Sequence, residues 1–226
     1  MKKTPENIKK IFNTISFDYD NLNDIISLWQ HKKIKKDILK PLKNTKFSKV
    51  LDLCTGTGDI AGLIKKSYPE ARVFGIDFSS SMLEIAKSRY KDITFVEGDC
   101  EQIPFDDNFF DVCIISFGLR NVENINTVLK EIYRVLKKDG IFINLDLGKP
   151  CFLANIFLKP YMKYWVKFLG KVFHGNSFPY EYFAKSNDDF PSPIELCEKY
   201  KNIGFTNIRI KDYIFGQISA QVCIKN

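Results

Sequence analysis

Val50-Leu51-Asp52-Leu53-Cys54-Thr55-Gly56-Thr57-Gly58-Asp59 is the stretch of this 226-residue chain that decides the fold. A short apolar run that contains an acid is followed by alternating glycines and then by apolar residues at helical spacing. This order predicts a strand, a tight loop and a helix, as in an α/β unit. Glycines let the backbone approach a ligand closely, and the start of a helix offers unpaired N–H groups. The stretch therefore predicts a nucleotide-binding loop.

Two kinds of cofactor fit this loop. Gly56, Gly58 and Ala61 match the G-x-G-x-x-G/A pattern of a dinucleotide site, with Asp77 after the next strand placed to bind ribose hydroxyls. Asp52 and the same glycines also match D-x-x-x-G-x-G, which resembles the loop of Rossmann-like S-adenosylmethionine-dependent methyltransferases. The loop alone leaves the choice open.

Composition limits the class of protein. With 45% hydrophobic residues, the chain is long enough for one well-buried domain. No run has the length of a transmembrane span, and the first residues lack the apolar core of a secretory signal, so we expect a cytoplasmic protein. Six scattered cysteines without C-x-x-C spacing and only two histidines argue against a metal site and predict free thiols. The net charge of +7 fits a polyanion, an anionic membrane surface or merely a solvated surface.

The rest of the chain continues the alternation of strands and helices. We expect strands at 49–53, 72–77, 93–96, 110–117 and 141–147, and helices at 58–66, 79–90 and 124–138. A helix at 194–203, ended by Gly204, and a hairpin of 207–211 with 213–224 follow. The pattern predicts a Rossmann-like, doubly wound α/β fold: a mostly parallel sheet with helices on both faces and a C-terminal antiparallel hairpin.

The chain is expected to form a single domain, 1–226, in four parts. Residues 1–46 form an N-terminal helical lid, and 47–149 form the cofactor-binding core. Residues 150–190 form an aromatic, lysine-flanked insertion that acts as a lid over a hydrophobic substrate, or else packs on the sheet. Residues 191–226 supply the last helix and the hairpin.

Polar residues follow several of the predicted strands, where ligands of open α/β sheets bind. Asp77 ends the second strand, and Asp99 follows the third, where its carboxylate suits the amino group of an adenine or, alternatively, caps a helix. Arg120 and Asn121 follow the central strand and are expected to face the active-site crevice.

Three further motifs carry a resemblance to a known family. They are Tyr19-Asp20-x-x-Asn23-Asp24-x-x-Ser27-x-x-x-His31, Ile115-Ser116-Phe117-Gly118-Leu119-Arg120-Asn121-Val122 and Arg134-Val135-Leu136-Lys137. With these motifs the chain resembles, over nearly its whole length, the C-methyltransferases of ubiquinone and menaquinone biosynthesis. The resemblance implies S-adenosylmethionine as cofactor. At the matching positions it implies a cofactor site made of Asp52, Gly56, Thr57, Gly58, Asp77, Asp99, Cys100 and Ser116.

The resemblance also implies a reaction, which is methylation of the ring carbon of demethylmenaquinol to give menaquinol. A polyprenyl-methoxybenzoquinol or another small lipid-like acceptor is the alternative. A quinol carbon becomes nucleophilic when a neighbouring hydroxyl loses its proton, so the enzyme must favour the phenolate. We expect Arg120 to stabilise that anion, Asn121 to orient a quinol oxygen and Tyr19 to close the site, with His31 or Asp146 as the general base.

Two other functional classes remain as rivals. A nucleic-acid methyltransferase would suit the basic charge, but no Asn-Pro-Pro-Tyr type motif follows the fourth strand. A non-catalytic membrane-associated binding module would require a dead cofactor site, yet Asp77 and both loop glycines are present. The expected partner is a prenylated quinol, with no nucleic acid and no metal. Peripheral contact with the inner face of the membrane and a homodimer are left open.

Overall fold

The computed structural model describes residue 8, residues 30–151, residue 156 and residues 190–226. Most of the predicted N-terminal lid and nearly all of the predicted aromatic insertion lie outside the described residues. The division of the chain into four parts therefore stays a prediction.

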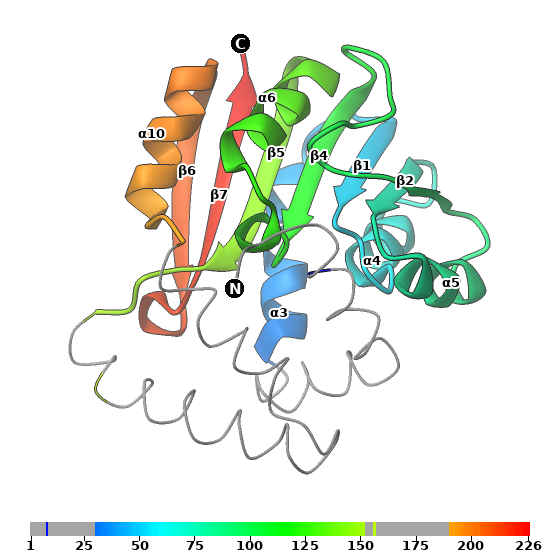
Figure 1. Cartoon of the computed structure of the whole chain (residues 1–226), viewed down its shortest axis with the longest axis horizontal. Coiled ribbons are helices and arrows are strands. Elements are labelled where there is room, and N and C mark those ends of the chain that lie inside the picture. Colours follow the sequence, from blue (N-terminus) through cyan, green and yellow to red (C-terminus); the bar gives the residue numbers. More distant parts are fainter. Residues whose placement is uncertain (1–7, 9–29, 152–155, 157–189) are drawn as a thin grey trace.

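A seven-stranded sheet forms the centre of the molecule, with the strand order β3-β2-β1-β4-β5-β7-β6 (Figure 1). The strands are β1 (Lys49–Leu53), β2 (Arg72–Asp77), β3 (Thr94–Glu97), β4 (Phe110–Ser116), β5 (Leu136–Leu147), β6 (Phe205–Tyr213) and β7 (Ile218–Lys225). β1 to β5 pair in parallel, and β7 lies antiparallel between β5 and β6. The predicted parallel sheet with a closing hairpin is confirmed. Since β2 and β3 extend to one side of β1 and β4 begins the other, the carboxyl ends of β1 and β4 form the crevice where such sheets bind ligands.

Helices cover both faces of the sheet, as predicted. The described helices are α3 (Gln30–Asp37), α4 (Asp59–Ser67), α5 (Ser80–Arg89), α6 (Ile125–Val135) and α10 (Pro193–Ile203), with short 3₁₀ turns η1 (Lys40–Leu42), η2 (Leu119–Asn121) and η4 (Ile214–Gly216). Apolar residues of α3, α4 and α5 share one hydrophobic cluster, and those of α6 and α10 share the other. Figure 1 shows α10 beside β6 at one end of the sheet and α4 and α5 at the opposite end.

Caps explain where several helices begin and end. The side chain of Ser79 accepts a hydrogen bond from the Met82 N–H at the start of α5. Ser192 and Glu195 form a reciprocal capping box at the start of α10. Gly204 ends α10 with φ = 119°, a left-handed conformation that favours glycine.

Two predicted boundaries are wrong because strand pairing overrides the local pattern. The helix predicted at 124–138 ends at Val135, and β5 begins at Leu136, which pairs with Phe110. Ile141 then pairs with Val112, so the polar residues in between form a bulge rather than the end of a helix. In the C-terminal hairpin, the turn lies at 214–217, after a longer first strand than the sequence predicted.

Candidate active site

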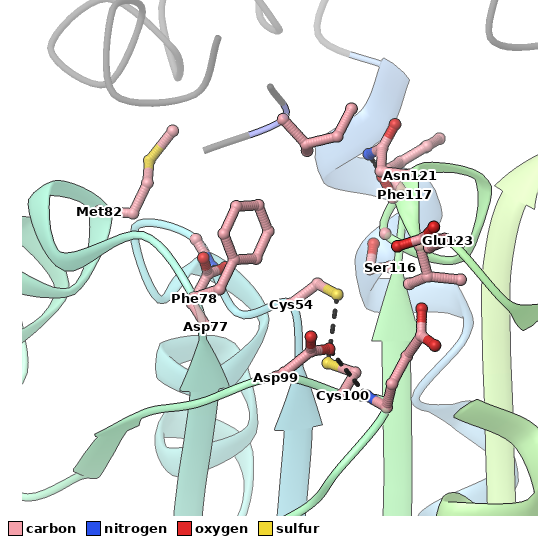
Figure 2. Close-up of a pocket in the computed structure, with 15 residues that line it drawn as sticks. Cys54, Asp77, Phe78, Met82, Asp99, Cys100, Ser116, Phe117, Asn121 and Glu123 are labelled. Carbon is pink, nitrogen blue, oxygen red and sulfur yellow. Dashed lines mark hydrogen bonds between the residues drawn. The ribbon is translucent and has the colours of Figure 1, made fainter. Parts of the chain in front are cut away.

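A pocket opens at the carboxyl ends of β1, β2 and β4, close to the point where the strand order reverses (Figure 2). Its walls come from the loop after β1, from β2 and the start of α5, from the segment after β3 and from the segment after β4. The lining residues are Ile8, Cys54, Gly56, Asp77, Phe78, Met82, Asp99, Cys100, Glu101, Ser116, Phe117, Gly118, Asn121, Val122 and Glu123. Six of the residues predicted from the sequence are therefore brought together here: Gly56, Asp77, Asp99, Cys100, Ser116 and Asn121.

Asp52 does not line the pocket but holds the glycine loop in place through hydrogen bonds. Its buried carboxylate oxygen Oδ2 accepts hydrogen bonds from Thr55 Oγ1 at 2.6 Å and from the Ala61 N–H at 3.1 Å. Burial raises the pKa of this carboxyl to about 7, although the two hydrogen bonds oppose the shift. Asp52 thus ties the end of β1 to the first turn of α4. Thr57 is buried in the same loop, and Gly58 has φ = 83°, so the turn into α4 needs a residue without a Cβ.

Asp77 ends β2 and holds two loops in place. Its Oδ2 accepts from the Gly56 N–H at 2.8 Å, and its Oδ1 accepts from the Ser79 N–H at 2.9 Å. The side chain is only 6% exposed, yet it forms part of the pocket wall. A carboxylate in this position offers hydrogen-bond acceptors to a ligand while fixing the glycine loop.

Asp99 lies in the segment after β3, lines the pocket and is exposed. Its Oδ1 accepts from the Glu101 N–H at 2.8 Å, which shapes a turn. No helix starts within the stretch 98–109, so Asp99 is not the helix cap that was the alternative interpretation. Figure 2 shows Cys100, which follows Asp99, next to Cys54 in the pocket wall.

The segment after β4 leaves the sheet through a strained turn. Phe117 has φ = 56°, a conformation that is costly for a residue with a side chain and that is concentrated at functional sites. A Cβ on the next residue, Gly118, would lie 2.5 Å from Cys54 Cβ, so glycine is required for this close contact. The Oγ of Ser116 is buried and has no hydrogen-bond partner within the described residues. An uncompensated buried hydroxyl in a pocket wall is suited to a ligand.

Arg120 and Asp146 form a buried ion pair behind this turn. The side-chain atom Arg120 Nη1 lies 2.5 Å from Asp146 Oδ1, and the backbone N–H of Arg120 donates to Asp146 Oδ2 at 3.1 Å. The Leu147 N–H also donates to Asp146, so the carboxylate accepts three hydrogen bonds. Asn121 adjoins the pair, donates to the Phe117 carbonyl at 3.2 Å and lines the pocket. Neither Arg120 nor Asp146 is itself among the lining residues.

Two predicted residues remain, and the structure describes only one of them. His31 is 5% exposed in α3 and does not line the pocket. Tyr19 lies outside the described residues. Sequence reasoning missed the pocket positions of Phe78, Met82 and Cys54. Phe78 directly follows the predicted strand-ending Asp77, which is a signal that could have identified it.

Comparison with known proteins identifies the family. The model of the ubiE/COQ5 methyltransferase family matches residues 1–225. The chain belongs to this family. Among ubiE/COQ5 relatives, the demethylmenaquinone methyltransferase of Anoxybacillus flavithermus is 36% identical over 218 residues, which cover 93% of this chain and 92% of that protein. The demethylmenaquinone methyltransferase of Staphylococcus aureus is 37% identical over 220 residues, covering 95% and 91%.

Solved structures show that the ubiE/COQ5 chain has the methyltransferase fold. A SAM-dependent methyltransferase from Thermotoga maritima superimposes with a TM-score of 0.72 and 21% identity, covering 97% of this chain and all of that chain. Phosphoethanolamine N-methyltransferase 2 from Haemonchus contortus, solved with S-adenosyl-L-methionine, gives a TM-score of 0.63 and 16% identity, covering 85% and 52%. At these identities the likeness concerns the fold.

Proposed function

We propose that this protein transfers the methyl group of S-adenosylmethionine to the ring carbon of demethylmenaquinol and so produces menaquinol. One observation carries the proposal. This chain is 36% to 37% identical to proteins named demethylmenaquinone methyltransferase, over more than nine tenths of both chains. The pocket adds support, because it lies at the carboxyl ends of the strands and combines acidic, hydroxyl and apolar groups.

The residues of the pocket fit the cofactor. Asp77 suits the ribose hydroxyls, and Asp99 with the backbone of Cys100 suits the adenine. The buried Ser116 Oγ and the Gly56 loop suit the methionine end, while Asp52, Thr57 and Gly58 keep that loop in shape. When bound, S-adenosylmethionine supplies an electrophilic methyl group on a sulfonium centre.

The ion pair of Arg120 and Asp146 suits the stabilisation of a phenolate. In our proposal Arg120 carries the positive charge that favours the anion of the acceptor, and Asn121 orients a quinol oxygen from the pocket wall. Asp146 accepts three hydrogen bonds, two of them from Arg120, and it does not line the pocket. We therefore assign Asp146 the role of positioning residue for Arg120 and retain His31 as the proposed base, with Tyr19 as the residue that closes the site.

A methyl-transfer assay with paired acceptors tests the proposal. Labelled S-adenosylmethionine is offered with a reduced naphthoquinol and, separately, with a reduced methoxybenzoquinol, and the product is identified by mass. We expect methylation of the naphthoquinol. Methylation of the benzoquinol alone would assign the alternative acceptor, and no product with either, despite measurable cofactor binding, would overturn the quinol assignment.

Contact with a membrane surface is also part of the proposal, since a prenylated quinol resides in lipid. Phe215, in the 3₁₀ turn between β6 and β7, is 79% exposed, and no helix within the described ranges is long and apolar enough to cross a bilayer. An exposed aromatic ring suits the membrane interface. Sedimentation with anionic vesicles tests this, and equal recovery of Phe215→Ala and the unmodified protein in the pellet would argue against the contact. A homodimer stays a prediction.

A further inference from the structure

Two cysteine thiols meet in the wall of the pocket. Cys54 Sγ lies 3.4 Å from Cys100 Sγ, although 46 positions separate the two residues in sequence (Figure 2). Both side chains line the pocket, and both are free thiols. Joining the sulfurs as a disulfide would shorten their separation to about 2.05 Å.

The surrounding backbone brings the two thiols together. Cys54 has φ = 51°, which sets the direction of its side chain. Gly118 packs against Cys54 so closely that an added Cβ would lie 2.9 Å from the sulfur. Cys100 is 4% exposed, whereas Cys54 is half-buried. Cys54 is therefore the thiol that a small oxidant entering the pocket meets first.

We propose that Cys54 and Cys100 are an oxidative modification site: a peroxide converts them to an intramolecular disulfide in the cofactor-free enzyme, and this cross-link weakens cofactor binding. The Cys54 sulfur attacks one oxygen of hydrogen peroxide, the O–O bond breaks, and the departing hydroxide takes the thiol proton and leaves as water, so that Cys54 becomes a sulfenic acid. Cys100 sulfur then attacks Cys54 sulfur, the S–O bond breaks, and a second water leaves. The peroxide is reduced, and the two thiols are oxidised. The inference rests on the proposed function of the pocket as the cofactor site.

The cross-link acts on cofactor binding through the segments that carry the two cysteines. Cys100 directly follows Asp99, and Cys54 precedes the Gly56 loop, so shortening the sulfur separation draws these two walls of the pocket together. A cofactor bound in the pocket covers the two thiols and keeps the oxidant out. The hydrogen bond with Cys100, together with burial, raises the pKa of the Cys54 thiol. The thiolate is consequently scarce, and oxidation requires sustained exposure to peroxide.

The test uses the full chain with the exposed Cys151 replaced, Cys151→Ala, to prevent disulfides between molecules. The protein is incubated with hydrogen peroxide, with and without S-adenosylhomocysteine. An unreduced digest is analysed by mass spectrometry, and S-adenosylhomocysteine affinity is measured by calorimetry before oxidation, after oxidation and after re-reduction. We expect a Cys54–Cys100 peptide only without ligand, and an affinity loss of about tenfold or more that re-reduction restores. Absence of the peptide, or unchanged affinity when it is present, would overturn the inference.

Each variant is compared with its own reduced form. Cys54→Ala and Cys100→Ala should lose the reversible response to peroxide, whereas Cys113→Ala, which removes a buried thiol outside the pocket, should keep it. A response that survives in Cys54→Ala would contradict the assignment. If the reduced enzyme does not bind S-adenosylhomocysteine at all, the proposed cofactor site fails and this inference fails with it. If it binds and peroxide has no effect, only the modification site is refuted.

Discussion

Arg120 Nη1 lies 2.5 Å from Asp146 Oδ1 in the interior, and the side chains are only 7% and 1% exposed. The pair joins the 3₁₀ turn after β4 to the end of β5, beside the pocket wall that contains Asn121. Removing one partner of a buried pair leaves a charge without compensation, which is strongly destabilising. A substitution at either position therefore affects folding as well as methyl transfer. Experiments on the pair must measure stability and activity separately.

The Asp146→Asn variant should lower the free energy of unfolding by about 3–5 kcal/mol, because the guanidinium of Arg120 stays buried without its counter-charge. Methyl transfer should also fall strongly, since Arg120 is no longer held in place. Urea denaturation and single-turnover rates measure the two effects. Asp111→Asn is the matched control: its carboxylate binds Lys137 and Ser48 far from the pocket, so it should cost stability but leave turnover intact.

A neutral pair separates the structural role from the catalytic one. In the Arg120→Met/Asp146→Asn double variant neither residue is charged, so we expect most of the lost stability to return. Turnover should stay low, because no cation is left to stabilise the phenolate, while the cofactor dissociation constant should change little. Recovery of methyl transfer along with stability would show that Arg120 has no catalytic part.

Asp77→Asn should raise the cofactor dissociation constant. The Gly56 and Ser79 N–H groups donate to separate oxygens of Asp77, and an amide can accept only one of them. A hydrogen bond from a ribose hydroxyl to the charged carboxylate contributes about 1.5–3 kcal/mol, so losing it as well predicts a rise of about 10- to 100-fold. Calorimetry with S-adenosylhomocysteine measures it. Glu84→Gln, which changes an exposed acid on α5, should bind normally, and equal affinities for both variants would refute the ribose assignment.

Gly118→Ala should be poorly tolerated. The new methyl group would lie 2.5 Å from Cys54 Cβ, which is held rigidly by its backbone, so the pocket wall must shift. We expect a loss of about 1–3 kcal/mol in the free energy of unfolding, together with weaker cofactor binding. At Gly98 the closest contact of the new methyl group would be the end of the Ile76 side chain, Cδ1, at 3.0 Å, so the same change should cost less. Thermal melts that rank Gly98→Ala as the more damaging change would contradict this steric argument.

The local sequence pattern predicts a strand well where turn residues directly follow its apolar run. The apolar runs 49–53 and 72–77 end at turn residues, and both strands have these bounds. The start of β5 could not be found in this way. Leu136 continues the helical periodicity of α6, and only its pairing with Phe110 on the neighbouring strand assigns it to the sheet.

The pocket was predictable to the extent that parallel topology determines it. Strands that run in parallel bring their carboxyl ends to one edge, so Asp77, Asp99 and Asn121 could be expected to lie together. The contacts between individual side chains were not predictable. Arg120, in the 3₁₀ turn after β4, and Asp146, on β5, are 26 positions apart in sequence. A lone acid at a strand end resembles a general base until its partners are known.

Asp52→Asn should change how stability depends on pH. Burial raises the pKa of Asp52 to about 7 from an ordinary value of 3.8, so the folded protein binds the proton more tightly than the unfolded chain. The contribution of Asp52 to the free energy of unfolding is therefore fully present at low pH, and it is lost as the pH rises from about 4 to about 7. Between pH 5 and pH 8 the wild type should lose about 3 kcal/mol relative to the Asp52→Asn variant, as measured by urea denaturation of both proteins. The lowered pKa values of Asp111 and Asp59 act with the opposite sign, and only below the ordinary aspartate pKa. A constant difference between wild type and variant across this range would mean that Asp52 is ionised in the folded protein at pH 5.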